Sequence, residues 1–377
     1  MIVLPARPAR DQRLDVIRGG LQIAIFVSHI ANSFVGGWFI HRAWGLSDSS
    51  EQFLFLSGFM LGSVYTLKAA RDSARAAASD IFRRAGRLYC THLTLCLGFF
   101  GMLALVSARF IPGELSRLGW GWLIADPLHA LPAILGMIYE PDWMDILPTF
   151  VWGMLLLPPF LFAVGRIGSW ALLPPALVYL AVQIGWITSP SLTEEIGMGF
   201  DPFAWQMLYL LGAWLGRRAL LYGRALPYDA PWAPLATAAA VLALVVGFYV
   251  KLSWHGFLPL PAPAVEAAWV YDKQEFAWPR LLHAMSLAWL VGAFMPRDAG
   301  WMRTGLAEAV ARMGRHSLEV FCLGVFLSYF VSTALRLWPG YFWVLDFGLS
   351  AVGIAILMGW ARILAGKRAP KPLAIAA

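Results

Sequence analysis

The stretch Asp15 to Ser33, DVIRGGLQIAIFVSHIANS, decides the fold class. It is mostly apolar and long enough to enter a lipid bilayer, yet it carries Asp15, Arg18, Gln22 and His29. Each residue of a helix turns by about 100°, so these four side chains fall on one stripe, about 16 Å long from Arg18 to His29. An ionisable group exposed to lipid costs on the order of 2.5–3.5 kcal/mol. We therefore expect the stripe to line a cavity; the alternative is a polar network between packed helices.

The rest of the chain has the composition of a membrane protein. Of its 377 residues, 59% are hydrophobic and 14% are charged, and the mean hydropathy is +0.65. This excludes an ordinary soluble domain, and apolar runs of about 20 residues exclude a barrel of short alternating strands. We predict an all-α, polytopic integral membrane protein with about ten transmembrane helices, at approximately residues 15–40, 48–67, 87–108, 144–164, 169–188, 204–221, 233–250, 278–296, 317–335 and 342–364.

The distribution of charge predicts the orientation. An even number of spans places both termini on one side of the membrane, and most of the 29 Lys and Arg residues fall on that side. By the positive-inside rule both termini are cytoplasmic, and the net charge of +7 reflects topology and not nucleic-acid binding. We expect one membrane domain over residues 1–377, with a cytoplasmic arm at 1–14 and a tail at 366–377. The three cysteines lack metal-ligand spacing, so no metal site is predicted.

A histidine inside a predicted span suggests proton-transfer chemistry. Glu51 opens the second span, at about the depth of His29 if the two helices are antiparallel neighbours. A carboxylate there would hold the imidazole in one tautomer; the alternative is that Glu51 is only interfacial. We predict acyl transfer across the bilayer, from an activated cytoplasmic donor to a hydroxyl on the outer side. His29 would be the general base, a role worth typically 10²–10⁴-fold in rate.

The inner face offers basic side chains for the phosphates of a donor such as coenzyme A. The segment Lys68 to Arg87 is predicted to be a basic loop. Its charge suits phosphate binding, although a topogenic cytoplasmic loop touching anionic lipid is sufficient to explain it. Ser317 is also expected to cap the ninth span. The donor-site candidates are Arg83, Arg84, Arg87, Arg315, His316 and Ser317.

Several segments resemble a known family. Arg18 and His29 match the Arg-X10-His signature of the membrane acyltransferase-3 superfamily, and FLFLSGF at 53–59 resembles its second-helix motif. More narrowly, the chain resembles the OpgC-type succinyltransferases of osmoregulated periplasmic glucans. The similar segments are LDVIRG at 14–19, SSEQFLFLSGF at 49–59, MDILPTF at 144–150, YDKQEFAWPRLLH at 271–283 and GRHSLEVF at 314–321.

The resemblance implies a function and a set of site residues. It makes His29 the catalytic base, places Asp15 and Arg18 at the donor end of a tunnel, and matches Glu51 to an acidic position of the family. It implies succinyl-CoA as the donor substrate, no permanently bound cofactor, a periplasmic glucan as the acceptor and the bacterial inner membrane as the location. The substrate-binding candidates are Trp143, Asp145, Lys273, Arg280 and His283, with Lys273 and Arg280 as cations for the free carboxylate of the succinyl group.

Three other functions stay open at this point. An O-acetyltransferase acting on another envelope polysaccharide would use the same chemistry. A proton-coupled transporter or flippase would use the stripe as a conduction path, but it predicts internal symmetry, which the sequence lacks. A sensor without catalysis would tolerate loss of His29. The oligomeric state is also open, with a homo-oligomer among the alternatives.

Overall fold

The computed structural model of the protein describes residues 10–189, 198–259, 272–297 and 299–368. Within these ranges the secondary structure is helical and contains no strand, which confirms the all-α prediction. Six stretches are long and apolar enough to cross a membrane, so the chain is a membrane protein. They are Ser49–Arg71, Ala74–Arg109, Ile146–Gln183, Ala233–Trp254, Ser317–Leu337 and Pro339–Lys367. All ten predicted ranges overlap a helix, but the count of ten spans stays a prediction.

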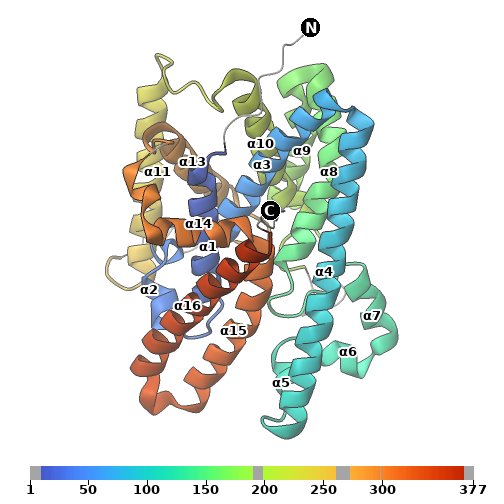
Figure 1. Ribbon diagram of the computed structural model, residues 1–377, viewed down its shortest axis with the longest axis vertical. Helices are drawn as coiled ribbons and strands as arrows, with labels where there is room; N and C mark the ends of the chain where they lie inside the picture. The colour runs from blue at the N-terminus through green and yellow to red at the C-terminus, as the bar shows by residue number, and fades with distance from the viewer. Residues whose placement is uncertain (1–9, 190–197, 260–271, 298, 369–377) are drawn as a thin grey trace, which may run out of the picture. The chain divides into compact units, whose positions relative to one another are not determined.

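The described residues form two compact units, whose helices are labelled in Figure 1. The larger unit, within Gly45–Ala293, contains α3 (Ser49–Arg71), α4 (Ala74–Arg109), α5 (Glu114–Arg117), α6 (Gly121–Ala125), α7 (Pro127–Leu135), α8 (Ile146–Ile167), η2 (Gly168–Leu172), α9 (Leu173–Gln183), α10 (Pro202–Tyr222), α11 (Ala233–Trp254) and all but the last residue of α13 (Trp278–Phe294). The smaller unit, within Ala9–Trp44 and Phe294–Ala377, contains α1 (Gln12–Ser28), α2 (Phe34–Trp38), η1 (His41–Ala43), η4 (Gly300–Arg303), α14 (Gly305–Arg315), α15 (Ser317–Leu337), η5 (Pro339–Tyr341) and α16 (Phe342–Arg368).

Glycines allow α3 and α10 to touch along their backbones in the larger unit (Figure 1). A Cβ atom built on Gly58 or Gly62 would lie 2.1 Å from a carbonyl oxygen of α10. The reverse holds for Gly212 and Gly216, whose Cβ atoms would lie 2.4 and 1.8 Å from carbonyl oxygens of α3. Small residues at such spacing let transmembrane helices pack closely. The small residues of α3 therefore predict its close packing, and α10 is the partner.

Replacing Gly216 with alanine should therefore separate the two helices. The new methyl group would meet the carbonyl oxygen of Phe59, and overpacking of this kind costs about 1–3 kcal/mol or more in free energy of unfolding. Gly101→Ala on α4 is the matched control, because nothing lies within 4 Å of a Cβ there. It should be neutral or stabilising by up to about 1 kcal/mol. Thermal unfolding in detergent measures both, and an unchanged midpoint for Gly216→Ala would contradict the close packing.

The first predicted span is not one helix. The sequence pattern predicts a span over 15–40, but α1 ends at Ser28 and a separate short helix begins at Phe34. The chain turns between them through Asn32, which has φ 61°, and Ser33, whose side chain caps α2 by accepting a hydrogen bond from Gly36 N–H. The helix also begins at Gln12, within the predicted arm at 1–14. At the other end α16 extends to Arg368, so its last residues fall within the predicted tail at 366–377, and the remaining residues of that tail lie outside the described ranges.

Two predicted loops are helical. Only a short turn at Asp72 and Ser73 separates α3 from α4, so Lys68 to Arg87 is not a loop. At about 1.5 Å per residue, the 36-residue α4 is about 54 Å long, well over the roughly 30 Å of a hydrocarbon core, which leaves room for its arginines outside lipid. The segment before the ninth predicted span forms α14, which packs on α1 where Gly19 and Gly314 leave no room for a Cβ.

Candidate active site

His29 follows directly on the last residue of α1, in the smaller unit. Its backbone is still helical, with φ −87° and ψ −5°. The ring atom Nδ1 lies 2.7 Å from the carbonyl oxygen of Ile25. Because a carbonyl oxygen only accepts, Nδ1 must carry the ring proton, and the lone pair of the neutral imidazole is on Nε2. The side chain is partly exposed. The local backbone therefore favours the tautomer in which Nε2 carries the lone pair.

Arg18 and Ser317 come together in the same unit although 299 positions separate them. The Arg18 guanidinium donates a hydrogen bond to the Ser317 hydroxyl. The prediction that Ser317 caps α15 is wrong, because the N-cap position is His316 and makes no side-chain capping bond. The Ser317 hydroxyl instead accepts the hydrogen bond from Arg18. Arg315 pairs with Glu308 on the same helix, and His316 is buried.

Asp15 is buried at the start of α1 and pairs with Arg10, with 2.6 Å between Oδ2 and Nε. Gln22 is also buried, whereas Arg18 and His29 are partly exposed. The predicted stripe thus divides into two buried residues and two accessible ones.

The turn after His29 is held by polar side chains that the sequence reading missed. Asp346 of α16 is fully buried and accepts hydrogen bonds from the Ser33 hydroxyl and the Val35 N–H. Ser332 of α15 accepts one from the Ala31 N–H at 2.9 Å. The sequence feature that could have identified Asp346 is its position as a charged residue inside the apolar run WVLDFGLS at 343–350.

The larger unit holds a buried cluster of charges around the start of α3. Glu51 is fully buried, and its Oε1 accepts a hydrogen bond from Arg280 Nε at 2.7 Å. Its other oxygen, Oε2, accepts from the Asp48 N–H at 2.8 Å and completes the capping box of α3. Lys273 Nζ lies 2.7 Å from Asp48 Oδ2. Both oxygens of Glu51 thus have partners here, and its pairing with His29 stays a prediction.

The cations of this cluster fix the ionisation of Asp48. Burial opposes its charged form, but the positive charges of Lys273 and Arg280 outweigh burial and hold the pKa of Asp48 well below its usual range. In this cluster two carboxyl groups, Asp48 and Glu51, thus face two cations, Lys273 and Arg280. Lys273 is the more accessible cation, with 39% of its side chain exposed against 9% for Arg280.

His283 belongs to a neutral network next to these charges. The Ser47 hydroxyl accepts a hydrogen bond from Gln52 Nε2 at 2.8 Å and lies 2.7 Å from His283 Nδ1. The Ser47 N–H also points at Nδ1, at 3.3 Å. Nδ1 is therefore an acceptor, and the ring proton is on Nε2. The ring proton is on Nδ1 in His29 and on Nε2 in His283. The Nε2 atom of His283 is therefore a hydrogen-bond donor, whereas the Nε2 atom of His29 is an acceptor.

Asp145 lies close enough to another carboxyl group, Glu140, to affect its pKa, and Glu140 was not among the predicted site residues. Glu140 Oε2 accepts a hydrogen bond from the Gly199 N–H at 2.8 Å, and a Cβ on Gly199 would lie 2.9 Å from Asp145 Oδ2. Burial, and then the charge of Asp145, raise the pKa of Glu140 well above its ordinary value of 4.5. Trp143 has φ 70° and packs edge-on against Phe99.

Glu140 should make the stability of the protein fall as the pH rises. A raised pKa means that the folded state holds the proton more tightly, so this stabilisation is full below about pH 4.5 and is lost as the pH rises through the folded-state value. Glu140→Gln keeps an oxygen for Gly199 N–H and removes the charge. The variant should lose less stability than wild type between about pH 5 and 8 in thermal unfolding. Asp72→Asn, at an exposed carboxylate, should leave the dependence unchanged, and parallel curves for Glu140→Gln and wild type would contradict the assignment.

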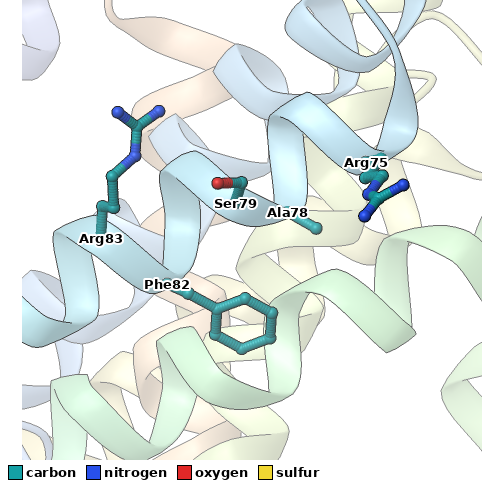
Figure 2. A pocket seen from close by; sticks show the side chains of 5 residues that line it. All are labelled: Arg75, Ala78, Ser79, Phe82 and Arg83. Carbon is teal, nitrogen blue, oxygen red and sulfur yellow. The ribbon is translucent and has the colours of Figure 1, made fainter.

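Arg83, Arg84 and Arg87 are exposed on the first half of α4. Arg83 lines a shallow hollow of about 560 Å³ together with Arg75, Ala78, Ser79 and Phe82, all from the same helix (Figure 2). In Figure 2 the guanidinium of Arg83 and the exposed phenyl ring of Phe82 extend to opposite sides of the helix, and Arg75 lies nearer its start. This part of α4 combines positive charge with an aromatic surface. Within the described ranges, no group of three or more His, Cys, Asp or Glu side chains is placed to hold a metal ion.

Comparison with protein families identifies the chain. The family model described as OpgC protein matches residues 10–368, nearly the whole chain and all of its described residues. The chain belongs to the OpgC family. No curated protein matches it. Membership of the OpgC family, together with the apolar helices, indicates a membrane-embedded enzyme of the acyltransferase type.

Proposed function

We propose that the protein transfers a succinyl group from cytoplasmic succinyl-CoA to hydroxyl groups of a periplasmic glucan, with His29 as the general base. The observation that carries the proposal is the hydrogen bond between His29 Nδ1 and the carbonyl oxygen of Ile25, which leaves the lone pair on Nε2. A hydroxyl is a weak nucleophile at neutral pH, so a positioned base is what the reaction needs most. In this proposal the chain lies in the bacterial inner membrane, with ten spans and both termini in the cytoplasm.

The proposed reaction balances in two proton transfers. His29 Nε2 takes the proton of the glucan hydroxyl while that oxygen attacks the thioester carbonyl carbon. The new C–O bond forms, the C–S bond breaks, and the imidazolium returns its proton to the departing thiolate of coenzyme A. No oxidant, metal or covalent acyl-enzyme is needed.

Arg18 and its neighbours are proposed to receive the other end of the donor. Arg18 lies eleven residues before His29, about 16 Å along the helix direction, so it is too far along α1 to act on the same carbonyl. Its contact with Ser317 places a guanidinium near the start of α15. An extended acyl-CoA would span this distance, with the acyl group at His29 and the polar end near Arg18. Asp15, Arg315 and His316 would complete that end.

The other predicted site residues keep roles of their own. Three arginines of α4 are proposed to attract the phosphates of the donor, namely Arg83, Arg84 and Arg87. Lys273, Arg280 and His283 are proposed to bind substrate, and the accessible Lys273 is the better cation for a free carboxylate. Trp143 and Asp145, next to Glu140, offer an aromatic ring and carboxylates, groups that suit a sugar.

A sidedness assay tests the proposed function. The protein is reconstituted into vesicles that enclose the glucan, and succinyl-CoA or acetyl-CoA is added outside. Succinyl ester on the enclosed glucan supports the proposal. Ester formed only from acetyl-CoA would instead support an O-acetyltransferase. If the acyl group accumulated inside the vesicles without any ester on the glucan, this result would overturn the proposed enzyme and support a transporter.

A further inference from the structure

The turn between α1 and α2 determines where the His29 ring can lie. It covers residues 29–33, and it includes a positive φ at Asn32 and the capping residue Ser33. A non-glycine residue with positive φ is uncommon and needs support from its surroundings. The support comes from outside the turn, because its neighbours on α15 and α16 supply hydrogen bonds to it.

Asp346 supplies the strongest of these contacts. Its Oδ1 accepts from the Ser33 hydroxyl at 2.6 Å, and its Oδ2 accepts from the Val35 N–H at 3.0 Å. The side chain is fully buried near the start of α16, within a stretch apolar enough to cross a membrane. A carboxylate in such a place is costly, and intramembrane ionisable residues usually serve function. Both of its oxygens are used to hold the start of α2.

Two serines of α15 hold the other side of the turn. Ser332 Oγ accepts from the Ala31 N–H at 2.9 Å, and Ser328 Oγ donates to the carbonyl oxygen of Phe26 at 2.9 Å. The backbone is thus fixed both before and after His29. These contacts all lie within the smaller unit.

We propose that Asp346 is a positioning residue for the base: through Ser33 and Val35 it holds the turn that keeps the His29 ring in its single tautomer and in place for proton transfer. Its role in catalysis rests on the proposed function of His29. Its role in ordering the ring does not. A misplacement of about 1 Å at a reacting group can cost on the order of 10²-fold in rate.

The first test observes the ring directly and needs no activity. Nitrogen NMR of protein labelled with ¹⁵N-histidine distinguishes Nδ1–H from Nε2–H, and the His29 signals among the seven histidines are assigned as those lost in His29→Ala. Wild type should show one tautomer, with the proton on Nδ1. Asp346→Asn should show a mixture, because the amide cannot accept from both donors. Ser350→Ala is the matched control: this serine is buried on α16, and its hydroxyl has no hydrogen-bond partner among the described residues.

The second test uses the transfer reaction, with wild type and His29→Ala alongside. Asp346→Asn should lower kcat by about 10–100-fold with less than threefold change in KM for the donor. Ser33→Ala, the milder change if Asp346→Asn folds poorly, should lower kcat by about tenfold. The double variant should be no worse than Asp346→Asn alone, since both act through one contact.

The outcomes separate the two proposals. A wild type that transfers no acyl group would end the proposed function, while a mixed tautomer in Asp346→Asn would still support the positioning role. An unchanged His29 signal in Asp346→Asn would overturn the positioning role, whatever the activity. The positioning role would also be overturned if the losses of kcat caused by Ser33→Ala and Asp346→Asn simply multiplied in the double variant.

Discussion

Replacement of His29 by alanine is expected to lower kcat for acyl transfer by about 10²–10⁴-fold, the range that a positioned general base contributes. The geometry around His29 is the reason for this expectation. The Ile25 carbonyl holds the proton on Nδ1, so Nε2 is ready to accept a proton without a change of tautomer. Alanine leaves only water to take the proton of the acceptor hydroxyl.

The matched control for this variant is His129→Ala. His129 is an exposed histidine on α7 that pairs with Asp126 at 2.7 Å, and we expect no effect of its loss on kcat. Initial rates over a range of donor concentrations give kcat and KM for each variant. If His29→Ala keeps more than a tenth of the wild-type kcat, the histidine is not the base.

Breaking the buried ion pair of Glu51 and Arg280 is expected to cause the largest loss of stability. Arg280→Met would leave the fully buried Glu51 without its cation, and loss of one partner of such a pair costs about 3–5 kcal/mol in free energy of unfolding. The double variant Glu51→Gln/Arg280→Met should recover much of this loss, because no uncompensated charge is left. Equilibrium unfolding in detergent measures both variants.

An exposed ion pair provides the comparison. Arg224 and Asp229 form one in the same unit, with both side chains more than half exposed, and Arg224→Met should cause no measurable change. If Arg280→Met were as stable as Arg224→Met, the charge cluster around Asp48 would not support the start of α3. If the double variant were as unstable as Arg280→Met, packing and not charge would explain the loss.

The helices were largely predictable because apolar runs of about 20 residues have few other solutions in a membrane protein. The incorrect predictions concern a helix break and a polar helix, which only short sequence patterns mark. The break after Ser28 was marked by Asn32 and Ser33, residue types that favour a turn and a helix start, but the apolar run across them dominated the pattern. Similarly, α14 was missed because it is too polar for a span, although Ala307, Ala311 and Gly314 already form a helical face.

The pairing of distant residues was not predictable from one sequence. Ser33 and Asp346 are 313 positions apart, and Glu51 and Arg280 are 229 apart. A charged side chain in a sequence has many eligible partners, and only packing selects among them. The close approach of α3 was predictable from its glycines, but its partner α10 was not. His29 stands out in the sequence because a titratable group inside an apolar run is costly to keep without a purpose, and its role as the base stays a prediction.

The most direct test of the central claim is the mass of the glucan after reaction. Purified protein in lipid is incubated with a β-glucan and succinyl-CoA, and the molecular mass of the glucan is measured by mass spectrometry. We expect glucan that has gained whole succinyl groups, which mild base releases as succinate. Glucan of unchanged mass, with protein that is folded and donor that is intact, would contradict it.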